Sequence, residues 1–367
     1  MKIQKITIYK AAIPLKYPFK IALGTIEVAE NIFIKIETNE GVYGWGEASP
    51  FSLVVGETPE SSLAQSVKIS KFLIKADPRN INTIDTKIKK HFSFNPTIRS
   101  AFNMALYDIL GKVSELPLFR LLGGADRDLI TDFTIGINTP EEMALHAEKI
   151  KEKGAQIVKI KVGEDVKTDI LRLKTVRKAL GSHISIRVDA NQSWRRSDAL
   201  LAASVMQDLD IELCKQPVQA NDITSLSIIR NCSPILIIAD ESVFNGHDAL
   251  RLILGQACDG FNIKLAKAGS IQEAVKIAML AESAHLECMI GCMMETRLGL
   301  TAAAHLAAAL PVIKYVDLDS AEMHSIDFIT GGIEYRSRGR IVLPEKPGLG
   351  VDIDKVFLKN LEKITIK

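Results

Sequence analysis

Lysine and aspartate side chains interrupt or follow several short apolar runs beyond residue 150 of this chain. Lys159 and Lys161 stand two residues apart in one run, so an extended strand points both to the same side. Burial of two ammonium groups against outer helices is costly, which favours an orientation into a barrel mouth over the outward alternative. Further ionisable groups lie within or follow other apolar runs: Asp189, Asp240, Lys264, Asp317 and Asp319.

These residue types suit proton transfer next to a carboxylate. Asp189 and Asp240 follow the third and fifth apolar runs, and two such carboxylates can hold a hard divalent cation. Lysines on opposite sides of that cation can remove a proton from the neighbouring carbon and return one to its other face. A lysine base needs a lowered pKa, which a second ammonium group nearby supplies. A strand-terminal aspartate alone is often only a helix cap, so the hypothesis depends on the whole set.

Eight apolar runs position these groups. They begin at intervals of about 24 to 27 residues and alternate with amphipathic segments, which predicts eight parallel strands and the helices between them. An open doubly wound sheet is the alternative, but the count of eight and the lack of a Gly-rich loop favour a barrel. The runs are Ile130–Ile135, Ile157–Val162, Ile184–Val188, Ile211–Cys214, Ile235–Ala239, Gly260–Leu265, Glu287–Ile290 and Val312–Val316.

The ends of the chain follow a different pattern. Residues 1–125 combine strand-like runs with helical periodicity over 60–114, which predicts an α+β capping domain. Residues 126–325 form the predicted barrel, and residues 326–367 are predicted to return to the capping domain. The expected strands outside the barrel are Ile3–Ile8, Ile32–Glu37, Val42–Trp45, Ile333–Tyr335 and Ile341–Leu343, with a short helix after the last. The predicted fold class is therefore α/β, a modified TIM barrel of the (β/α)7β type with a capping domain.

Composition narrows the class of protein. The 46 Lys and Arg residues nearly balance the 44 Asp and Glu residues, so the net charge of +2 argues against a strongly basic nucleic-acid binder. The most apolar window, 301–313, is too short to span a bilayer, and the N-terminus is strand-like rather than a signal peptide. The five cysteines form no CxxC pair, which favours reduced thiols and a cytoplasmic protein.

Together, the motifs resemble the enolase superfamily. The lysines assign the chain to the muconate cycloisomerase subgroup, and within it the chain is similar to dipeptide epimerases, the relatives of L-Ala-D/L-Glu epimerase. The resemblance covers essentially the whole chain, and the ordered set is far more specific than any one motif. The segments that carry it are KIKVG, RVDANQSW, IADES, FNIKLAK, GCMMETRLGLTAAAH and DLD.

The resemblance implies a role for each group at the barrel mouth. Lys161 and Lys264 would be the two acid/base catalysts, and Lys159 would neutralise the substrate carboxylate. Asp189 and Asp240 would ligate Mg²⁺. The implied reaction inverts the Cα of the second residue of an L,L-dipeptide by 1,1-proton transfer.

The resemblance also implies a binding site for the rest of the dipeptide. Asp317 and Asp319 would bind its α-ammonium group, and Thr134, Cys292 and Met294 would line the pocket. Capping loops near residues 21–25 and 50–56 would select the second side chain. Glutamyl-specific relatives carry an Arg in the first loop where this chain has Gly24, so a neutral, apolar second residue is expected. No nucleic-acid or membrane partner is expected, and a homo-oligomer is compatible with the family.

One residue departs from the family pattern. The third metal ligand of the family, a Glu before Gln-Pro or Glu-Pro, is replaced here by Lys215. Glu212 lies three residues earlier, so strand alternation points it to the other face. An ammonium group between Asp189 and Asp240 would match the charge of Glu plus Mg²⁺ without acting as a Lewis acid.

This departure leaves several hypotheses open. In the first, the chain is an epimerase with weakened or absent Mg²⁺ binding. In the second, it is a metal-free enzyme that uses Lys215 as its electrophile. In the third, it is an impaired homologue that binds dipeptides. Other activities of the subgroup also use the lysine pair: N-acyl amino acid racemase, o-succinylbenzoate synthase and muconate cycloisomerase. None of these three needs a clamp for a free α-ammonium group.

Overall fold

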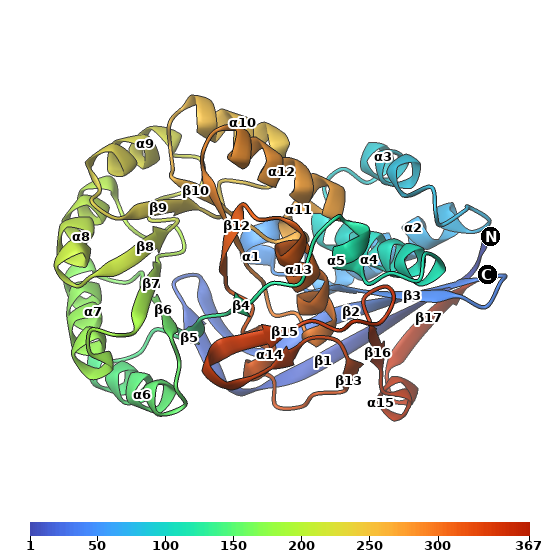
Figure 1. Ribbon diagram of the computed structural model, residues 1–367, viewed down its shortest axis with the longest axis horizontal. Helices are drawn as coiled ribbons and strands as arrows, with labels where there is room; N and C mark the ends of the chain where they lie inside the picture. The colour runs from blue at the N-terminus through green and yellow to red at the C-terminus, as the bar shows by residue number, and fades with distance from the viewer.

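The computed structural model describes all residues 1–367. A barrel and a capping lobe lie side by side in it (Figure 1). The lobe contains a four-stranded antiparallel sheet in the order β17-β1-β2-β3. Pairing of the last strand with the first places the two chain ends close together at one end of the molecule (Figure 1). The strands are β1 Ile3–Ile21, β2 Gly24–Thr38, β3 Tyr43–Ala48 and β17 Glu362–Ile366.

Helices cover one face of this sheet. Ile32, Ile34 and Ile36 of β2 pack against them, whereas Phe33 points to the core on the barrel side. Gly46 of β3 lies so close to the longest helix that a Cβ atom would stand 1.8 Å from the Ala101 carbonyl oxygen. The covering helices are α2 Pro59–Leu73, α3 Ile81–His91 and α4 Pro96–Val113. The lobe also contains the short helices α1 Ser52–Val55 and α5 Leu118–Leu121.

The barrel is one eight-stranded parallel sheet whose spatial order follows the sequence, β5 to β12. This order excludes a doubly wound sheet, in which the strand order reverses. The sheet curls, and the bridge between Thr131 and Val316 joins its two edges. The strands are β5 Phe133–Ile135, β6 Ile157–Lys161, β7 Ser185–Asp189, β8 Ile211–Lys215, β9 Leu236–Ala239, β10 Gly260–Ile263, β11 Glu287–Ile290 and β12 Ile313–Val316.

The connecting helices form an arc outside the strands (Figure 1). Side-chain caps such as Asp165 and Asn245 accept hydrogen bonds from the first helical N–H groups, which fixes where these helices begin. Leu213, Ile238 and Met289 pack inside the barrel and form an apolar floor below the mouth. The helices are α6 Pro140–Glu152, α7 Val166–Leu180, α8 Arg196–Asp208, α9 Ile223–Cys232, α10 Gly246–Leu254, α11 Leu265–Ala268, α12 Ile271–Ser283 and α13 Arg297–Ala309.

The C-terminal segment contacts both parts of the molecule. The β14–β15 hairpin pairs with β4 at the start of the barrel, whereas β17 joins the capping sheet. The remaining elements are β4 Leu129–Ile130, α14 Ser320–Met323, β13 Ile329–Gly331, β14 Glu334–Tyr335, the 3-10 turn Ser337–Gly339, β15 Arg340–Val342, β16 Val351–Ile353 and α15 Lys355–Lys359.

The predicted fold class is confirmed, with several differences in the strands. β1 and β2 are far longer than the expected Ile3–Ile8 and Ile32–Glu37, because a bulge between Pro14 and Phe19 lets the pairing continue. The first barrel run splits into β4 and β5, since Leu129 and Ile130 pair with the C-terminal hairpin instead. β17 was not expected from the sequence. The domain boundaries near residues 125 and 325 stay predictions.

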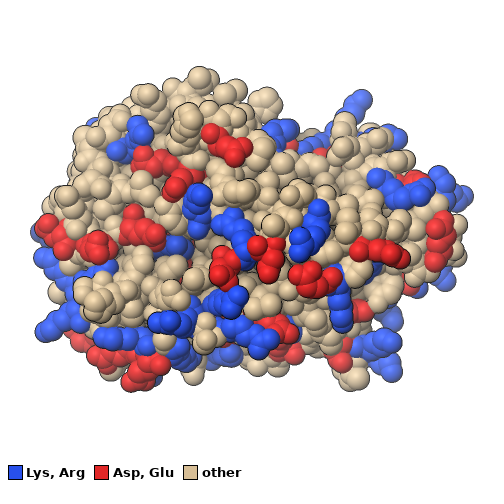
Figure 2. All heavy atoms as spheres, viewed as in Figure 1, with Lys and Arg blue, Asp and Glu red and all other residues tan.

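The surface agrees with the near-neutral composition. Acidic and basic side chains are interspersed on the face shown in Figure 2, without a large area of one sign. None of the helices combines the length and apolar character needed to cross a membrane.

Glu47 of β3 joins the lobe to the barrel. Its carboxylate accepts hydrogen bonds from the Asn31 side chain (2.8 Å), from Thr296 N (2.8 Å) and from Gly299 N (2.8 Å), the last two at the start of α13. Burial raises the pKa of Glu47 to about 7, although these hydrogen bonds act in the opposite direction. Burial also raises the pKa of Glu295 to about 7.

Glu47→Gln tests this linkage. A raised carboxyl pKa means that the folded state binds more protons, so the contribution of Glu47 to stability falls as pH rises from about 4.5 to 7. The difference in unfolding free energy between wild type and variant is expected to change by up to about 3 kcal/mol over this window. Urea titrations at several pH values measure it, with exposed Glu148→Gln as control. A difference in unfolding free energy that does not change with pH would contradict the raised pKa of Glu47.

Candidate active site

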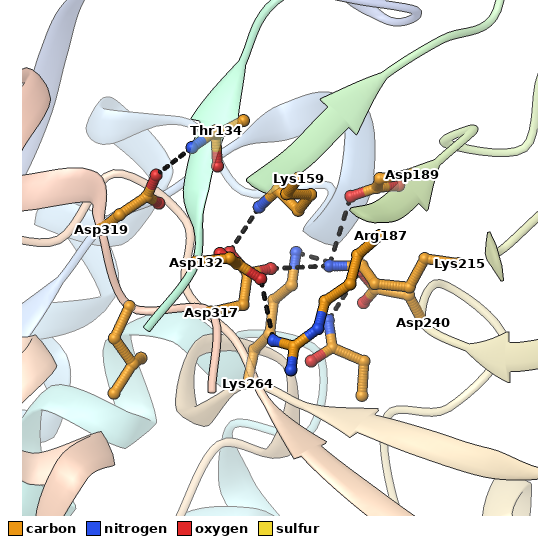
Figure 3. A network of polar contacts seen from close by, with 12 residues as sticks. Asp132, Thr134, Lys159, Arg187, Asp189, Lys215, Asp240, Lys264, Asp317 and Asp319 are labelled. Atoms are coloured by element: carbon orange, nitrogen blue, oxygen red, sulfur yellow. Dashed lines mark hydrogen bonds and ion pairs between the residues drawn. The ribbon is translucent and has the colours of Figure 1, made fainter. Parts of the chain in front are cut away.

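The predicted ionisable groups gather at the carboxyl ends of the barrel strands. Lys159 and Lys161 lie on β6, Asp189 ends β7 and Lys215 ends β8. Asp240, Lys264, Asp317 and Asp319 follow β9, β10 and β12. All eight side chains belong to buried residues, with at most 7% of each residue exposed. Figure 3 shows labelled members of this set converging on one place from separate strands. The inward orientation of the two β6 lysines therefore agrees with the sequence interpretation.

Lys215 stands at the centre of this set. Its Nζ atom lies 3.2 Å from Asp189 Oδ2, 3.4 Å from Asp240 Oδ2 and 2.9 Å from Asp317 Oδ2 (Figure 3). β8 runs between β7 and β9, so its last side chain reaches the space between the two flanking aspartates. Glu212 instead pairs with Arg187, at 2.8 Å.

Electrostatics keep this cluster ionised. Burial alone would raise the pKa of Asp189, but Lys161 and Lys215 outweigh it and hold the pKa below its usual value. The pKa values of Asp240 and Asp317 are lowered in the same way by their lysine partners. Burial would lower the pKa of Lys215, but the three carboxylates raise it well above normal. Lys215 is therefore an ammonium group at neutral pH.

Lys161 and Lys264 occupy different environments. Lys161 Nζ lies 2.8 Å from Asp189 Oδ2, and Lys264 Nζ lies 3.2 Å from Asp240 Oδ2. Burial lowers the pKa of Lys161, and the neighbouring ammonium groups reinforce this effect against Asp189. Burial also disfavours charged Lys264, but Asp240 outweighs it, and the pKa of Lys264 is raised. The pair thus combines a more readily deprotonated lysine with a more firmly protonated one.

The two aspartates after β12 are not equivalent. Asp317 is an acceptor for both Lys159 and Lys215, one on each carboxylate oxygen. Asp319 Oδ2 accepts a hydrogen bond from Thr134 N at 2.7 Å (Figure 3). Burial, together with Asp317, raises the pKa of Asp319. The Thr134 hydroxyl is buried without a hydrogen-bond partner, which leaves it free to contact a ligand.

Several polar residues of the site were not assigned from the sequence. Lys267 Nζ contacts Asp240 Oδ1 at 2.5 Å, and the Asn262 amide donates to Asp240 Oδ2 at 2.8 Å. Asn191 Oδ1 accepts from Lys161 at 2.8 Å. The spacing of Lys264 and Lys267 was a usable signal, because a short turn after a strand returns residue i+3 to the strand end.

A second ion pair lies nearby. Asp132 Oδ2 is 3.1 Å from Arg187 Nη1, and its other oxygen is buried without a partner. Burial and the charge of Asp317 raise the pKa of Asp132 to about 8. Asp132 precedes Thr134 by two residues, so strand alternation could have placed it on the same face.

A cavity of about 260 Å³ lies in the capping lobe where the lobe borders the barrel. Thr25 of the first predicted loop, residues 50–52 of the second and Met294 of the barrel all line it. Acidic Glu27, Glu30 and Glu57 also line the cavity, and no lysine or arginine does. The tip of the β1–β2 hairpin contacts the barrel, since Ile137 N donates to Lys20 O at 2.8 Å.

Cys292 lies beside the aspartates that follow β12. Its Sγ atom and carboxylate oxygens of Asp317 and Asp319 all lie within 4.8 Å of one another. All five cysteines are free thiols. Burial raises the pKa of the Cys292 thiol, so a thiolate ligand is disfavoured here, and both Asp317 oxygens already accept from lysines.

Comparisons with known proteins agree with this fold. Residues 3–123 match the N-terminal domain of the mandelate racemase/muconate lactonizing enzyme family, and residues 142–356 match the enolase C-terminal domain-like family. The chain therefore belongs to the mandelate racemase/muconate lactonizing enzyme family of the enolase superfamily.

Several of its relatives within this family are named as dipeptide epimerases. A D-Ala-D/L-Ala epimerase of Cytophaga hutchinsonii is 41% identical over all of both chains. A hydrophobic dipeptide epimerase of Enterococcus faecalis is 42% identical over 96% of this chain and 99% of its own. The crystal structure of the Cytophaga hutchinsonii dipeptide epimerase with Mg and D-Ala-L-Val has a TM-score of 0.99, with 40% identity and full coverage of both chains.

The residues of this chain do not fit a bound Mg²⁺ at the expected place. Lys215 Nζ lies within 3.4 Å of the Asp189 and Asp240 oxygens that would have to bind the ion. An ammonium group donates hydrogen bonds, repels a cation and offers no lone pair when protonated. The remaining oxygen ligands are two carboxylates that already accept from other lysines.

Lys215→Met measures how strongly the cluster depends on this ammonium group. Removing one partner of a buried ion pair leaves the other charge uncompensated, at a cost of about 3–5 kcal/mol. We expect a loss of this size in unfolding free energy by urea titration at pH 7, against no more than about 0.5 kcal/mol for Lys174→Met on the exposed face of α7. A loss equal to that of the control would contradict the charge assignment.

Proposed function

We propose that this protein epimerises dipeptides at the Cα of the second residue. One of the two lysines Lys161 and Lys264 removes the Cα proton, and the other donates a proton to the opposite face. The observation that carries the proposal is the placement of these lysines. They come from β6 and from the end of β10, and each pairs with a different member of the Asp189/Asp240 pair. The naming of full-length relatives as dipeptide epimerases supports the substrate class.

In this mechanism the substrate Cα lies between the two lysines. The neutral amine of one lysine takes the Cα proton, and the electron pair of the broken C–H bond moves into the carboxylate, giving an ene-diolate. The ammonium group of the other lysine then donates a proton to the opposite face, so the configuration inverts. The lowered pKa of Lys161 and the raised pKa of Lys264 suit Lys161 as base and Lys264 as acid in one direction.

Other residues of the mouth would bind the substrate termini. Lys159 would neutralise the substrate carboxylate, and Asp319 with Asp317 would accept from its α-ammonium group. Thr134, Cys292 and Met294 would line the pocket. Because both Asp317 oxygens are already occupied by lysines, an N-acylated amino acid, which has no α-ammonium group, is the second candidate substrate.

Solvent deuterium exchange tests the two-lysine mechanism. Wild-type protein in D₂O is expected to incorporate deuterium at the second Cα of L,L-dipeptides and to invert that centre, as read by mass spectrometry and chiral chromatography. Lys161→Met and Lys264→Met each remove one acid/base group. The rate of inversion is expected to fall at least about 100-fold in both variants. The remaining lysine should still exchange the Cα proton of one diastereomer for deuterium without inverting it.

The control for this experiment is Lys174→Met, which should match wild type. Equal inversion by either single-lysine variant would refute the lysine pair. Labelling of N-acetylated or N-succinylated amino acids, with none of free dipeptides, would select the second candidate. An absence of label in every substrate would reject epimerisation and favour a binding role.

The cavity lining predicts the preference for the second side chain. With three acidic residues and no basic one around it, an anionic side chain would meet like charge. We expect L-Ala-L-Leu to be labelled at least about 10-fold faster than L-Ala-L-Glu at equal concentration, a difference of 1.4 kcal/mol or more. Competition in one D₂O tube measures the ratio. Faster labelling of L-Ala-L-Glu would exclude this cavity as the specificity pocket.

A further inference from the structure

The cation-binding position of the site already contains a positive charge of the chain itself. Lys215 is 1% exposed, and its Nζ atom lies between carboxylates that come from the strands on either side of its own. The distances to Asp189 Oδ2 and Asp240 Oδ2 differ by only 0.2 Å, from 3.2 to 3.4 Å. This is where a cation shared by both carboxylates would have to bind.

Three carboxylates surround the ammonium group of Lys215. Its Nζ atom donates a hydrogen bond to Asp317 Oδ2 at 2.9 Å and forms ion pairs with Asp189 and Asp240, so three carboxylate oxygens lie within 3.4 Å of it. The Asp317 contact joins the cation position to the carboxylate pair that follows β12.

Charge balance argues in the same direction. One ammonium group carries the same net charge as one carboxylate together with a divalent cation. Replacement of a glutamate ligand and its metal by lysine therefore leaves the net charge of the buried mouth unchanged. Addition of Mg²⁺ to the cluster as it stands would bring two uncompensated charges into a buried region, which is strongly unfavourable.

We propose that the Lys215 ammonium is a built-in cation that takes the place of a divalent metal, so that the protein binds no metal between Asp189 and Asp240. The inference concerns this chain without substrate and does not require turnover. Its consequence for catalysis, that epimerisation proceeds equally well in EDTA, rests on the proposed function.

Metal binding to the substrate-free protein is the direct test. Mn²⁺ is a suitable probe, because its binding is counted by electron paramagnetic resonance and it accepts the same oxygen ligands as Mg²⁺. Wild type and the exposed control Lys174→Glu are expected to leave submillimolar Mn²⁺ free. Lys215→Glu, which supplies a third carboxylate, is expected to bind one Mn²⁺ per chain.

Thermal unfolding provides a second readout of the same equilibrium. Ligand binding to the folded state raises the unfolding midpoint, so Mg²⁺ should raise the midpoint of Lys215→Glu relative to EDTA and leave wild type and control unchanged. If Lys215→Glu does not fold, the Mn²⁺ titration of wild type still decides, and an absence of bound ion supports the proposal. Mn²⁺ bound by wild type and lost in Asp189→Asn would overturn it.

The failure of this inference is distinguishable from failure of the proposed function. Deuterium exchange that is equal in EDTA and in Mg²⁺ supports both. Exchange that requires Mg²⁺ would reject the proposal that Lys215 replaces the metal and would support the proposed epimerase activity. If wild type binds no metal and labels no substrate, the proposal that Lys215 replaces the metal stands and the proposed epimerase activity is rejected.

Discussion

Buried carboxylates in a barrel mouth are stable as anions only when positive groups lie within hydrogen-bonding distance, and Lys215 meets this need for three of them at once. The lowered pKa values of Asp189, Asp240 and Asp317 all depend on this ammonium group together with Lys159, Lys161, Lys264 and Lys267. The apolar floor below the mouth increases the dependence, because it separates these charges from water on one side.

The capping lobe completes the site from the other side. Gly46 lets β3 lie directly on α4, and the next residue, Glu47, holds the start of α13. The same lobe extends the β1–β2 hairpin to the barrel loops and supplies most of the cavity that Met294 closes. The cavity and the lysines of the barrel mouth therefore belong to different parts of the chain, which buried hydrogen bonds such as those of Glu47 hold together.

Sequence reasoning was most successful where a property is local. Alternation along β6 was enough to place Lys159 and Lys161 on one face, and the apolar run before Asp189 located a strand end. It failed where pairing partners lie far apart: the N-terminal strands extend well beyond their apolar segments because each supports the other, and Glu362–Ile366 forms a strand only because β1 offers a free edge. Lys267 of α11 was overlooked because its partner, Asp240, follows a different strand, β9.

The sequence by itself determined the repeat of eight strands and the ionisable residues at their ends. These features follow from residue type and periodicity. Only the tertiary structure decided that Lys215 also binds Asp317, 102 residues away, and that both oxygens of Asp317 are thereby occupied. The reason is geometric: curling of the sheet brings β12 across the mouth from β8, and no local pattern encodes which side chains then meet.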